Sequence, residues 1–410
     1  MDNLELTLPE YNAAVLQTAS RVYGHSAQDI ASFLGIVSVS AEKLLRGEKE
    51  PSDKQLEELA DLYNIRSMAF FESGIPNFEM PLNDFRHNDR SNNSLSPKAL
   101  KQVHKIIDSN DALEGLLNEY GFRSSFQSTL YSSVSNLTEL ISDRVVSKVR
   151  NYLNVDLNSI RKLVHDGKRP HAEFYTRLAV ESAGFSVRSG QSSLSDFSGF
   201  MYNGSVIPLV FVNSSRHKNS RAFTIFHEVA HALLGSSSLS NSLYSQSSIE
   251  KACDSFASKV MAPRDYVEDV IKKVSDPKKR VTRLFHNSLL SRQASAVRLY
   301  DLDLIDYETK DSIFKITKPK KRGGGNLPAH YDGLHSSNFV DLYRSGFLAA
   351  SFAQDFAAEK QADPYTLTQV LGYDARRLPA ATKIIRLRVE DLRSFEVELS
   401  LPDWLERVLP

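Results

Sequence analysis

The sequence predicts an α+β fold that is mostly helical, on the basis of three observations. Four or five short helical segments with capping residues follow one another in residues 11–70. Two β-rich runs, Phe197–Tyr202 and Val206–Val212, flank Asn203-Gly204, a dipeptide typical of a tight hairpin turn. Most of the remaining chain has apolar residues at helical spacing. We therefore expect an all-helical N-terminal module, a domain with a small antiparallel sheet, and a helical C-terminal region ending in a mixed tail.

The composition excludes several classes of protein. The 410 residues include 50 Lys and Arg and 50 Asp and Glu, so the whole chain has no charge that would draw it to nucleic acid or to a membrane. The first residues lack a basic start followed by an apolar core, and no run of 18 apolar residues occurs. We therefore expect a cytoplasmic protein. Because Cys253 is the single cysteine, a metal site must use histidine and carboxylate ligands.

Residues 11–70 have the pattern of a helix-turn-helix module. Ser26 and either Ser38 or Ser40 can cap helix starts, and Gly35 and Gly47 stand where helices end. The second helix of the motif would expose four candidate DNA-binding residues: Ser38, Ser40, Lys43 and Arg46. The module has six Lys and Arg against eight Asp and Glu, so strong binding to phosphate is not expected from it. A plain helical bundle, or a module that recruits a protein, is the alternative.

The rest of the chain is predicted from the same signals. Residues 73–95 form a connector, and residues 96–121 form a spacer helix capped by Ser96. Apolar spacing predicts helices from residue 136 to Gly190, before the hairpin. A serine-rich loop follows at 236–248, then a helix at 249–261, and a Lys- and Gly-rich linker at 318–326. We expect helices around 337–358 and 364–371 and a more strand-like stretch at 382–399.

The sequence His-Glu-Val-Ala-His at 227–231 carries the chemistry. On a helix, His227 and His231 project from one face and can bind one ion, and Glu228 can reach a metal-bound water. The surrounding residues are apolar, so burial of these three side chains without partners would be costly. A zinc ion would supply those partners. Glu228 would then act as a general base that takes a proton from the water. It would later act as a general acid and give that proton to the leaving amine.

A catalytic zinc needs a third protein ligand, and a later helix supplies a candidate. Glu250 and Asp254 are one helical turn apart in residues 249–263. This spacing lets Glu250 bind the metal while Asp254 accepts a hydrogen bond from a ligand histidine and fixes its tautomer. A solvated helix face is the alternative. Cys253 is interpreted as a packing residue, and the oxyanion-stabilising group is left open among four candidates: Tyr202, His217, Tyr244 and Tyr266.

With these residues in place, the chain resembles the ImmA/IrrE family of metallopeptidases, in a long form with an N-terminal Xre-like helix-turn-helix. The matching stretches are IASFLGIVSVSAEKLLRGEKEPSDKQLEELADLYNI, PLNDFRH, DFSGFMYNGSVIPLVFVNSS, NSRAFTIFHEVAHALLG, EKACDSFASKVMAP and RGGGN. The resemblance implies an Xre-like domain at 1–72, a connector and spacer helix at 73–135, a zinc metallopeptidase domain at 136–310 and a C-terminal helical region and tail at 311–410. Ala230 replaces the family's usual glycine, and residues 373–410 extend beyond the matching part.

What the resemblance implies is a gluzincin-like fold in which His227, His231 and Glu250 hold Zn2+ and Glu228 is the base. Such proteins cleave a repressor partner and thereby release stress-response or mobile-element genes, while others act in toxin–antitoxin or phage-defence systems. The expected partners are therefore a repressor-like or toxin protein. DNA bound through the first domain and a second copy of the chain are further alternatives, and no membrane contact is expected. The competing hypothesis is a DNA-binding regulator or antitoxin whose metal site is structural or vestigial.

A substrate peptide is expected to add as an extra strand along the edge of the 197–212 hairpin, because this is a common way to dock beside such a site.

Overall fold

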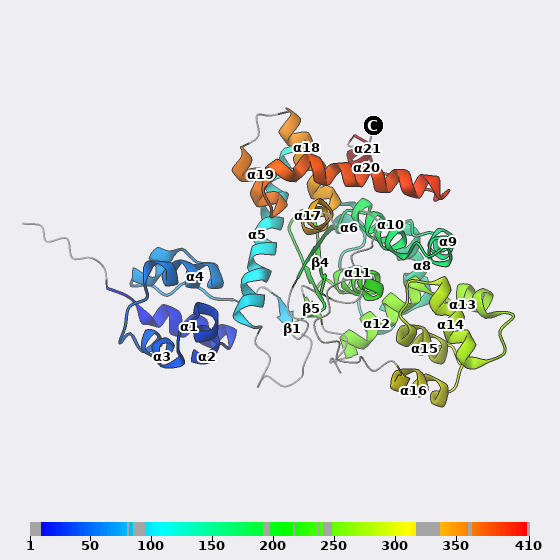
Figure 1. The fold of residues 1–410 in the computed structure, drawn as a ribbon, viewed down its shortest axis with the longest axis horizontal. Coiled ribbons are helices and arrows are strands. Elements are labelled where there is room, and N and C mark those ends of the chain that lie inside the picture. Colours follow the sequence, from blue (N-terminus) through cyan, green and yellow to red (C-terminus); the bar gives the residue numbers. More distant parts are fainter. Residues whose placement is uncertain are drawn as a thin grey trace, which may run out of the picture. The chain divides into compact units, whose positions relative to one another are not determined.

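The computed structural model describes residues 10–79, 82–84, 95–191, 197–215, 218–236, 238–240, 248–316, 337–359 and 363–407. It divides into two compact units. One comprises residues 1–83 and 87–108, and the other comprises residues 84–86 and 109–410. The fold is mostly helical with a small sheet, as the sequence predicts (Figure 1). The prediction that this sheet is antiparallel is wrong, because Ser186–Gly190 pairs in parallel with Leu209–Asn213 and makes the sheet mixed. The linker predicted at 318–326 and most of the serine-rich loop lie outside the described residues.

The first unit consists of helices, and capping residues set their ends. Ser26 caps α2 in a capping box with Asp29, and Gly35 ends α2 in the left-handed conformation at φ 66°. The predicted cap at Ser38 or Ser40 is wrong: α3 follows Val37, whose side chain makes no capping hydrogen bond. The elements of this unit are α1 (Ala13–Tyr23), α2 (Ala27–Leu34), α3 (Ser38–Arg46), α4 (Asp53–Tyr63), η1 (Ser67–Phe71) and the first part of α5 (Pro97–Glu119).

Two histidines lie in the core of this first unit. His25 Nε2 is 3.0 Å from the carbonyl oxygen of Leu95, and His104 Nδ1 is 3.1 Å from that of Leu62. Both imidazoles are buried, with exposed fractions of 6% each. Burial lowers the pKa of each histidine below its usual value. Both side chains therefore favour the neutral state in the folded unit.

The sheet of the second unit has the strand order β1-β5-β3-β4-β2. The described strands pair in two ways, since β2 is parallel to β4 while β3 is antiparallel to both β4 and β5. Phe200 on β3 lies opposite Phe211 on β4, with ring centroids 5.0 Å apart. The strand bounds are β1 (Asn83–Asp84), β2 (Ser186–Gly190), β3 (Gly199–Tyr202), β4 (Leu209–Asn213) and β5 (Ser238–Ser240).

Helices cover this sheet. The helix α11 (Lys218–Leu233) packs against β3 and β4, and α12 (Ser248–Met261) packs against α11 (Figure 1). The remaining helices of the unit are α6 (Ser125–Thr129), α7 (Leu137–Leu140), α8 (Asp143–Tyr152), α9 (Leu157–His165), α10 (Arg169–Ser182), α13 (Arg264–Ile271), α14 (Pro277–Asn287), α15 (Arg292–Asp301), α16 (Tyr307–Ile316), α17 (Ser337–Ser345), α18 (Phe347–Glu359), α19 (Pro364–Leu371), η2 (Ala375–Arg377), α20 (Leu378–Ser394) and α21 (Asp403–Glu406). No helix among these described segments is long and apolar enough to cross a membrane.

The β-hairpin is present, but the predicted tight turn at Asn203-Gly204 is wrong. The strands end at Tyr202 and resume at Leu209, so residues 203–208 form a longer connection than a two-residue turn. The longer loop is held from α5, where the Glu114 carboxylate accepts hydrogen bonds from the amides of Ser205, Val206 and Ile207 at 2.9–3.1 Å.

Two further predictions of secondary structure are wrong. The predicted helix to Gly190 breaks at Gly184, whose φ of 94° is left-handed, and β2 follows. The stretch at 382–399 is predicted as strand-like, yet its larger part forms α20. Its buried residues have the helical period, at Leu378, Ala381, Thr382, Ile385, Val389 and Leu392. The alternation of Ile385, Leu387 and Val389 suggested a strand, but Leu387 is 46% exposed.

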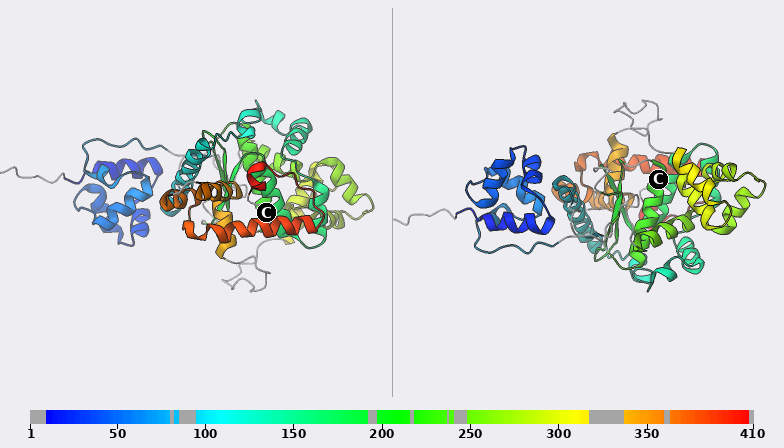
Figure 2. Two further views of the ribbon diagram at one scale, coloured as in Figure 1. Left: turned by 90° about the horizontal axis from the view of Figure 1, so that it is seen from above. Right: turned by 90° about the horizontal axis from the view of Figure 1, so that it is seen from below.

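A buried ion pair joins the C-terminal helices to the sheet. Arg177 and Glu181, on α10, are 2% and 0% exposed and lie 3.0 Å apart. Glu181 accepts the amide of Leu348 at the start of α18, and Arg177 donates to the carbonyls of Val187 and Tyr343. The helix α20 packs against α17 and α18, so the whole C-terminal region belongs to the second unit (Figures 1 and 2).

Candidate metal centre

The helix α11 is buried around its polar residues. Phe226, Val229, Ala230, Ala232 and Leu233 are all 0% exposed. In the same helix, His227, Glu228 and His231 are 2%, 0% and 0% exposed. Three polar side chains therefore lie in an apolar interior, as the sequence predicts. Such burial is costly unless partners stabilise the polar groups.

The first partner is Glu250 on α12, which is 1% exposed. One carboxylate oxygen is 3.2 Å from His227 Nε2, and the other is 3.0 Å from His231 Nε2. Neither contact has hydrogen-bond geometry. Ligand atoms of a tetrahedral zinc site, with bonds of about 2.0–2.1 Å, lie about 3.3 Å apart. The two measured N···O distances are therefore compatible with a metal ion shared by the two imidazoles and the carboxylate.

The second partner is Asp254, one turn after Glu250. Its Oδ1 is 2.8 Å from His227 Nδ1, and its side chain is 35% exposed. An acceptor at Nδ1 keeps the proton there and directs Nε2 toward Glu250. The structure thus brings together His227, His231, Glu250 and Asp254, while their roles at a metal stay a prediction.

The carboxylates and burial shift the pKa values of the two histidines in opposite directions. Burial alone would lower the pKa of His227, but the contacts with Asp254 and Glu250 outweigh it and raise the pKa well above its usual value. Burial lowers the pKa of His231. Burial would raise the pKa of Glu250, yet both histidines hold that pKa at about 2. These contacts therefore favour the charged forms of His227 and Glu250 in the absence of other partners.

Glu228 lies against the sheet rather than against solvent. It lies close to Gly199 on β3, where an added Cβ would be 2.9 Å from Glu228 Oε1 and 2.7 Å from the carbonyl oxygen of Phe211. Only glycine fits this contact. Sequence analysis did not identify Gly199, although a glycine within a strand is a signal of close backbone approach.

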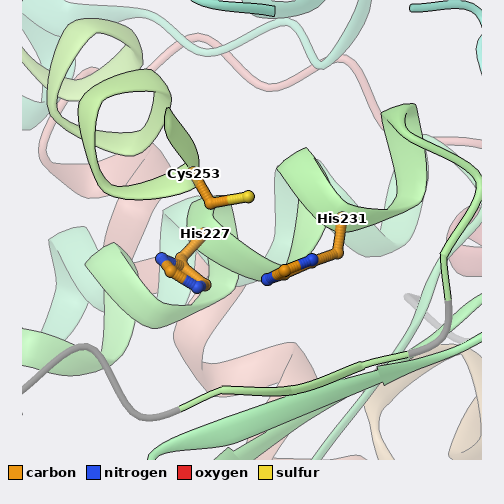
Figure 3. A group of neighbouring side chains, drawn as sticks. All are labelled: His227, His231 and Cys253. Atoms are coloured by element: carbon orange, nitrogen blue, oxygen red, sulfur yellow. The ribbon is translucent and has the colours of Figure 1, made fainter. Parts of the chain in front are cut away.

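Cys253 is close to the two histidines. A nitrogen of His227, a nitrogen of His231 and Cys253 Sγ all lie within 4.8 Å of one another, and Figure 3 shows the thiol directed toward the imidazoles. Burial raises the pKa of Cys253 well above its usual value, and the charges of Glu250 and Glu228 raise it further. A protonated thiol is a poor ligand. Glu250 is the better third ligand because its oxygens already face both imidazoles.

The other predicted site residues have different environments. The Tyr266 hydroxyl on α13 donates to the carbonyl oxygen of Asn287 on α14, so this phenol is hydrogen-bonded between these two helices. Tyr202 is half-buried at the end of β3. His217 and Tyr244 lie outside the described residues.

The candidate DNA-binding residues lie on α3. Ser38 and Ser40 are half-buried, while Lys43 and Arg46 are exposed. Arg46 lies 3.7 Å from Glu42 and 3.8 Å from Glu48, so acidic neighbours offset its charge. Val37 and Val39 are 69% and 61% exposed beside them. The DNA-binding role of this helix stays a prediction.

The expected docking edge of the hairpin is already paired. β3 pairs with β5 along Gly199–Met201, and β4 pairs with β2 along Leu209–Asn213. The prediction that a peptide adds directly along this hairpin is therefore wrong for the described conformation. The chain's own strands occupy both sides, and the sequence offered no clear signal for β2 or β5.

Comparison with protein families gives one match. The peptidase family M78 model, described as the IrrE N-terminal-like domain, matches residues 180–295. This range contains β2 to β5, α11 and α12, and so includes His227, Glu228, His231 and Glu250. The match supports the resemblance to the ImmA/IrrE family and points to a metallopeptidase-type domain. Comparison with curated proteins gave no match, and neither did comparison with solved structures.

Proposed function

We propose that the protein is a zinc-dependent endopeptidase that cleaves a specific partner protein. The observation that carries this proposal is the position of Glu250, whose two oxygens face His227 Nε2 and His231 Nε2 at 3.2 and 3.0 Å. The family match to residues 180–295 supports a metallopeptidase-type activity. A buried Glu228 beside these donors supports hydrolysis rather than a purely structural site, since a structural zinc needs no general base.

The residues have separate roles in this proposal. His227, His231 and Glu250 would hold Zn2+, which as a Lewis acid polarises a carbonyl and lowers the pKa of water. Glu228 takes a proton from the attacking water and delivers it to the nitrogen of the departing amine. Asp254 holds the His227 ring so that Nε2 faces Glu250. The apolar surroundings of α11 exclude bulk water and strengthen these charge interactions.

The proposed substrate is a repressor-like protein, and the reaction would act as a switch in stress response, mobile-element control or phage defence. The ImmA/IrrE resemblance supports this choice. The helical module at 10–71 would then contact DNA or the partner protein. Since the module has more acidic than basic residues, recognition of a protein is the better-supported role.

The test compares the wild-type protein with Glu228→Gln. The amide keeps the size of the side chain but cannot accept the proton. We expect both proteins to retain about one zinc by elemental mass spectrometry, while new protein termini in the host proteome occur only with the wild type. Glu390→Gln, an exposed change on α20, is the matched control. If Glu228→Gln produces the same new termini and the same biological effect, catalysis is not the function.

A further inference from the structure

The segment around the start of α14 concentrates positive charge. Residues 272–286 include six Lys and Arg and one acidic residue, Asp276, although the whole chain has 50 of each charge. Lys272, Lys273, Lys279 and Arg283 are exposed. The excess is therefore local to this surface of the second unit, and no part of the proposed peptidase chemistry accounts for it.

A pocket of about 650 Å³ opens in this surface. It lies between the end of α9, the turn from α13 to α14, and α14 itself, and Thr282 and Asn287 contribute polar groups to it. Its volume is within the range of about 300–1,000 Å³ that small-ligand pockets have. Five of its lining side chains can carry positive charge: His165, Lys273, Lys279, Arg283 and His286.

His165 has an acidic neighbour, since its Nδ1 is 3.3 Å from Asp166 Oδ1, but three of the other cations do not pair with a described carboxylate. Within the described part of the protein, no carboxylate pairs with Lys273, Lys279 or Arg283. The acid in the pocket, Asp276, accepts the amide of Lys279 at 2.8 Å as the cap of α14. Like charges gathered in a concave site repel one another unless an anion lies between them.

Arg280, in the same segment, is a cation with a structural role and contrasts with the cations of the pocket. Arg280 donates to the carbonyl oxygens of Val274 and Leu304, both at 2.7 Å, and so holds the turn before α14. Lys273, Lys279 and Arg283 make no such contact in the described structure. Their side chains therefore remain available to a ligand.

We propose that this pocket binds the oligophosphate group of a small ligand, of about the size of a nucleoside triphosphate. Lysine ammonium groups bind phosphate oxygens as point charges, and Arg283 offers a planar pair of donors for the same oxygens. A nucleic-acid strand fits less well because the positive surface is interrupted. Asp166 follows His165, and Asp269 lies exposed on α13.

The experiment titrates the full-length protein with tripolyphosphate, ATP and adenosine by calorimetry. We expect saturable binding of tripolyphosphate and ATP and none of adenosine. The double variant Lys273→Gln, Lys279→Gln should bind about tenfold more weakly or worse, because each lysine gives a charge-assisted contact. The control Lys148→Gln, Lys383→Gln removes the same charge from exposed sites on α8 and α20. It should bind like the wild type.

Three results would overturn the proposal. These are the absence of saturable binding by the wild type, equal weakening in both double variants, and tighter binding of a short single-stranded DNA through the same two lysines. The last result would assign the surface to nucleic acid instead. Circular dichroism melts of both double variants confirm that any loss of binding is not a loss of folding. The result does not depend on peptidase activity, so it can succeed or fail independently of the proposed function.

Discussion

Gly199 on β3 and Glu228 on α11 lie so close that a methyl group on Gly199 would be 2.9 Å from Glu228 Oε1. The same methyl group would be 2.6 Å from Thr224 Cγ2 and 2.7 Å from the Phe211 carbonyl oxygen. Backbone and side-chain atoms thus confine the glycine on three sides. The contact fixes the position of the proposed general base against the sheet.

The first prediction is that Gly199→Ala lowers both stability and proteolysis. Overpacking of this kind costs about 1–3 kcal/mol, and displacement of Glu228 should lower turnover by about tenfold or more. Zinc content should not change, because the metal donors lie elsewhere. Urea unfolding, metal analysis and cleavage of the identified partner measure the three effects. Gly115→Ala, where an added Cβ meets no atom within 4 Å, is the control. Full turnover by Gly199→Ala would contradict the role of this contact.

The second prediction concerns Asp254, whose carboxylate is 2.8 Å from His227 Nδ1. Asp254→Asn weakens the acceptor and should lower zinc affinity by about 10–100-fold. Competition with a chelator of known affinity measures this change. Asp265→Asn on α13, which changes an exposed aspartate, should leave zinc affinity unchanged. Equal zinc affinity in wild type and Asp254→Asn would mean that the aspartate does not support the ligand.

The third prediction separates Glu250 from Cys253 as the third ligand. Glu250→Gln should lose zinc, whereas Cys253→Ala should retain it, because the Glu250 oxygens face both imidazoles at 3.0–3.2 Å. Cobalt substitution adds a direct test, since a thiolate ligand gives an intense charge-transfer band. We expect no such band in the wild type. A band that disappears in Cys253→Ala would instead make Cys253 a ligand.

Local spacing was enough to group the candidate site residues because they occupy two helices. His227 and His231 are four residues apart, and so are Glu250 and Asp254, so each pair shares a helix face wherever the helix lies. Gly199 could not be assigned in this way. Its role depends on how closely β3 approaches α11, which is a property of tertiary packing.

Contacts between distant parts of the chain also explain two other features that local spacing did not predict: a buried ion pair and the strand β2. Arg177 and Glu181 have the spacing of an ordinary surface pair, but they are buried because α17 and α18 cover them. β2 contains Arg188 and two serines, so its apolar content is low. Its stability comes from pairing with β4 and from Arg188, which donates to the carbonyl oxygens of Ser109 and Val370. Such long-range partners leave no local periodicity.

The fourth prediction is that acid destabilises the first unit. The folded-state pKa values of His25 and His104 are lowered, so the unfolded chain binds protons more readily. Stability from the neutral imidazoles is complete above about pH 6.5 and falls as the pH drops through that value toward the folded-state pKa values. The protection factors of amides in residues 10–79 and 95–108, which are corrected for the slower intrinsic exchange in acid, should fall at low pH. His104→Gln should reduce this pH dependence, and an unchanged dependence would contradict the assignment.

The fifth prediction tests whether the C-terminal helices are part of the fold of the second unit. Arg177→Met leaves Glu181 buried beside the amide of Leu348 without its cation, and Glu181→Gln leaves the arginine without its anion. Each change should destabilise the unit by about 3–5 kcal/mol. The double variant should lose less than the sum, because no uncompensated charge remains. Denaturant unfolding of all four proteins gives this coupling. If the losses in the free energy of unfolding of the two single variants add up to that of the double variant, the two charges do not stabilise each other. The ion pair would then not hold α18, which would depend on its apolar contacts.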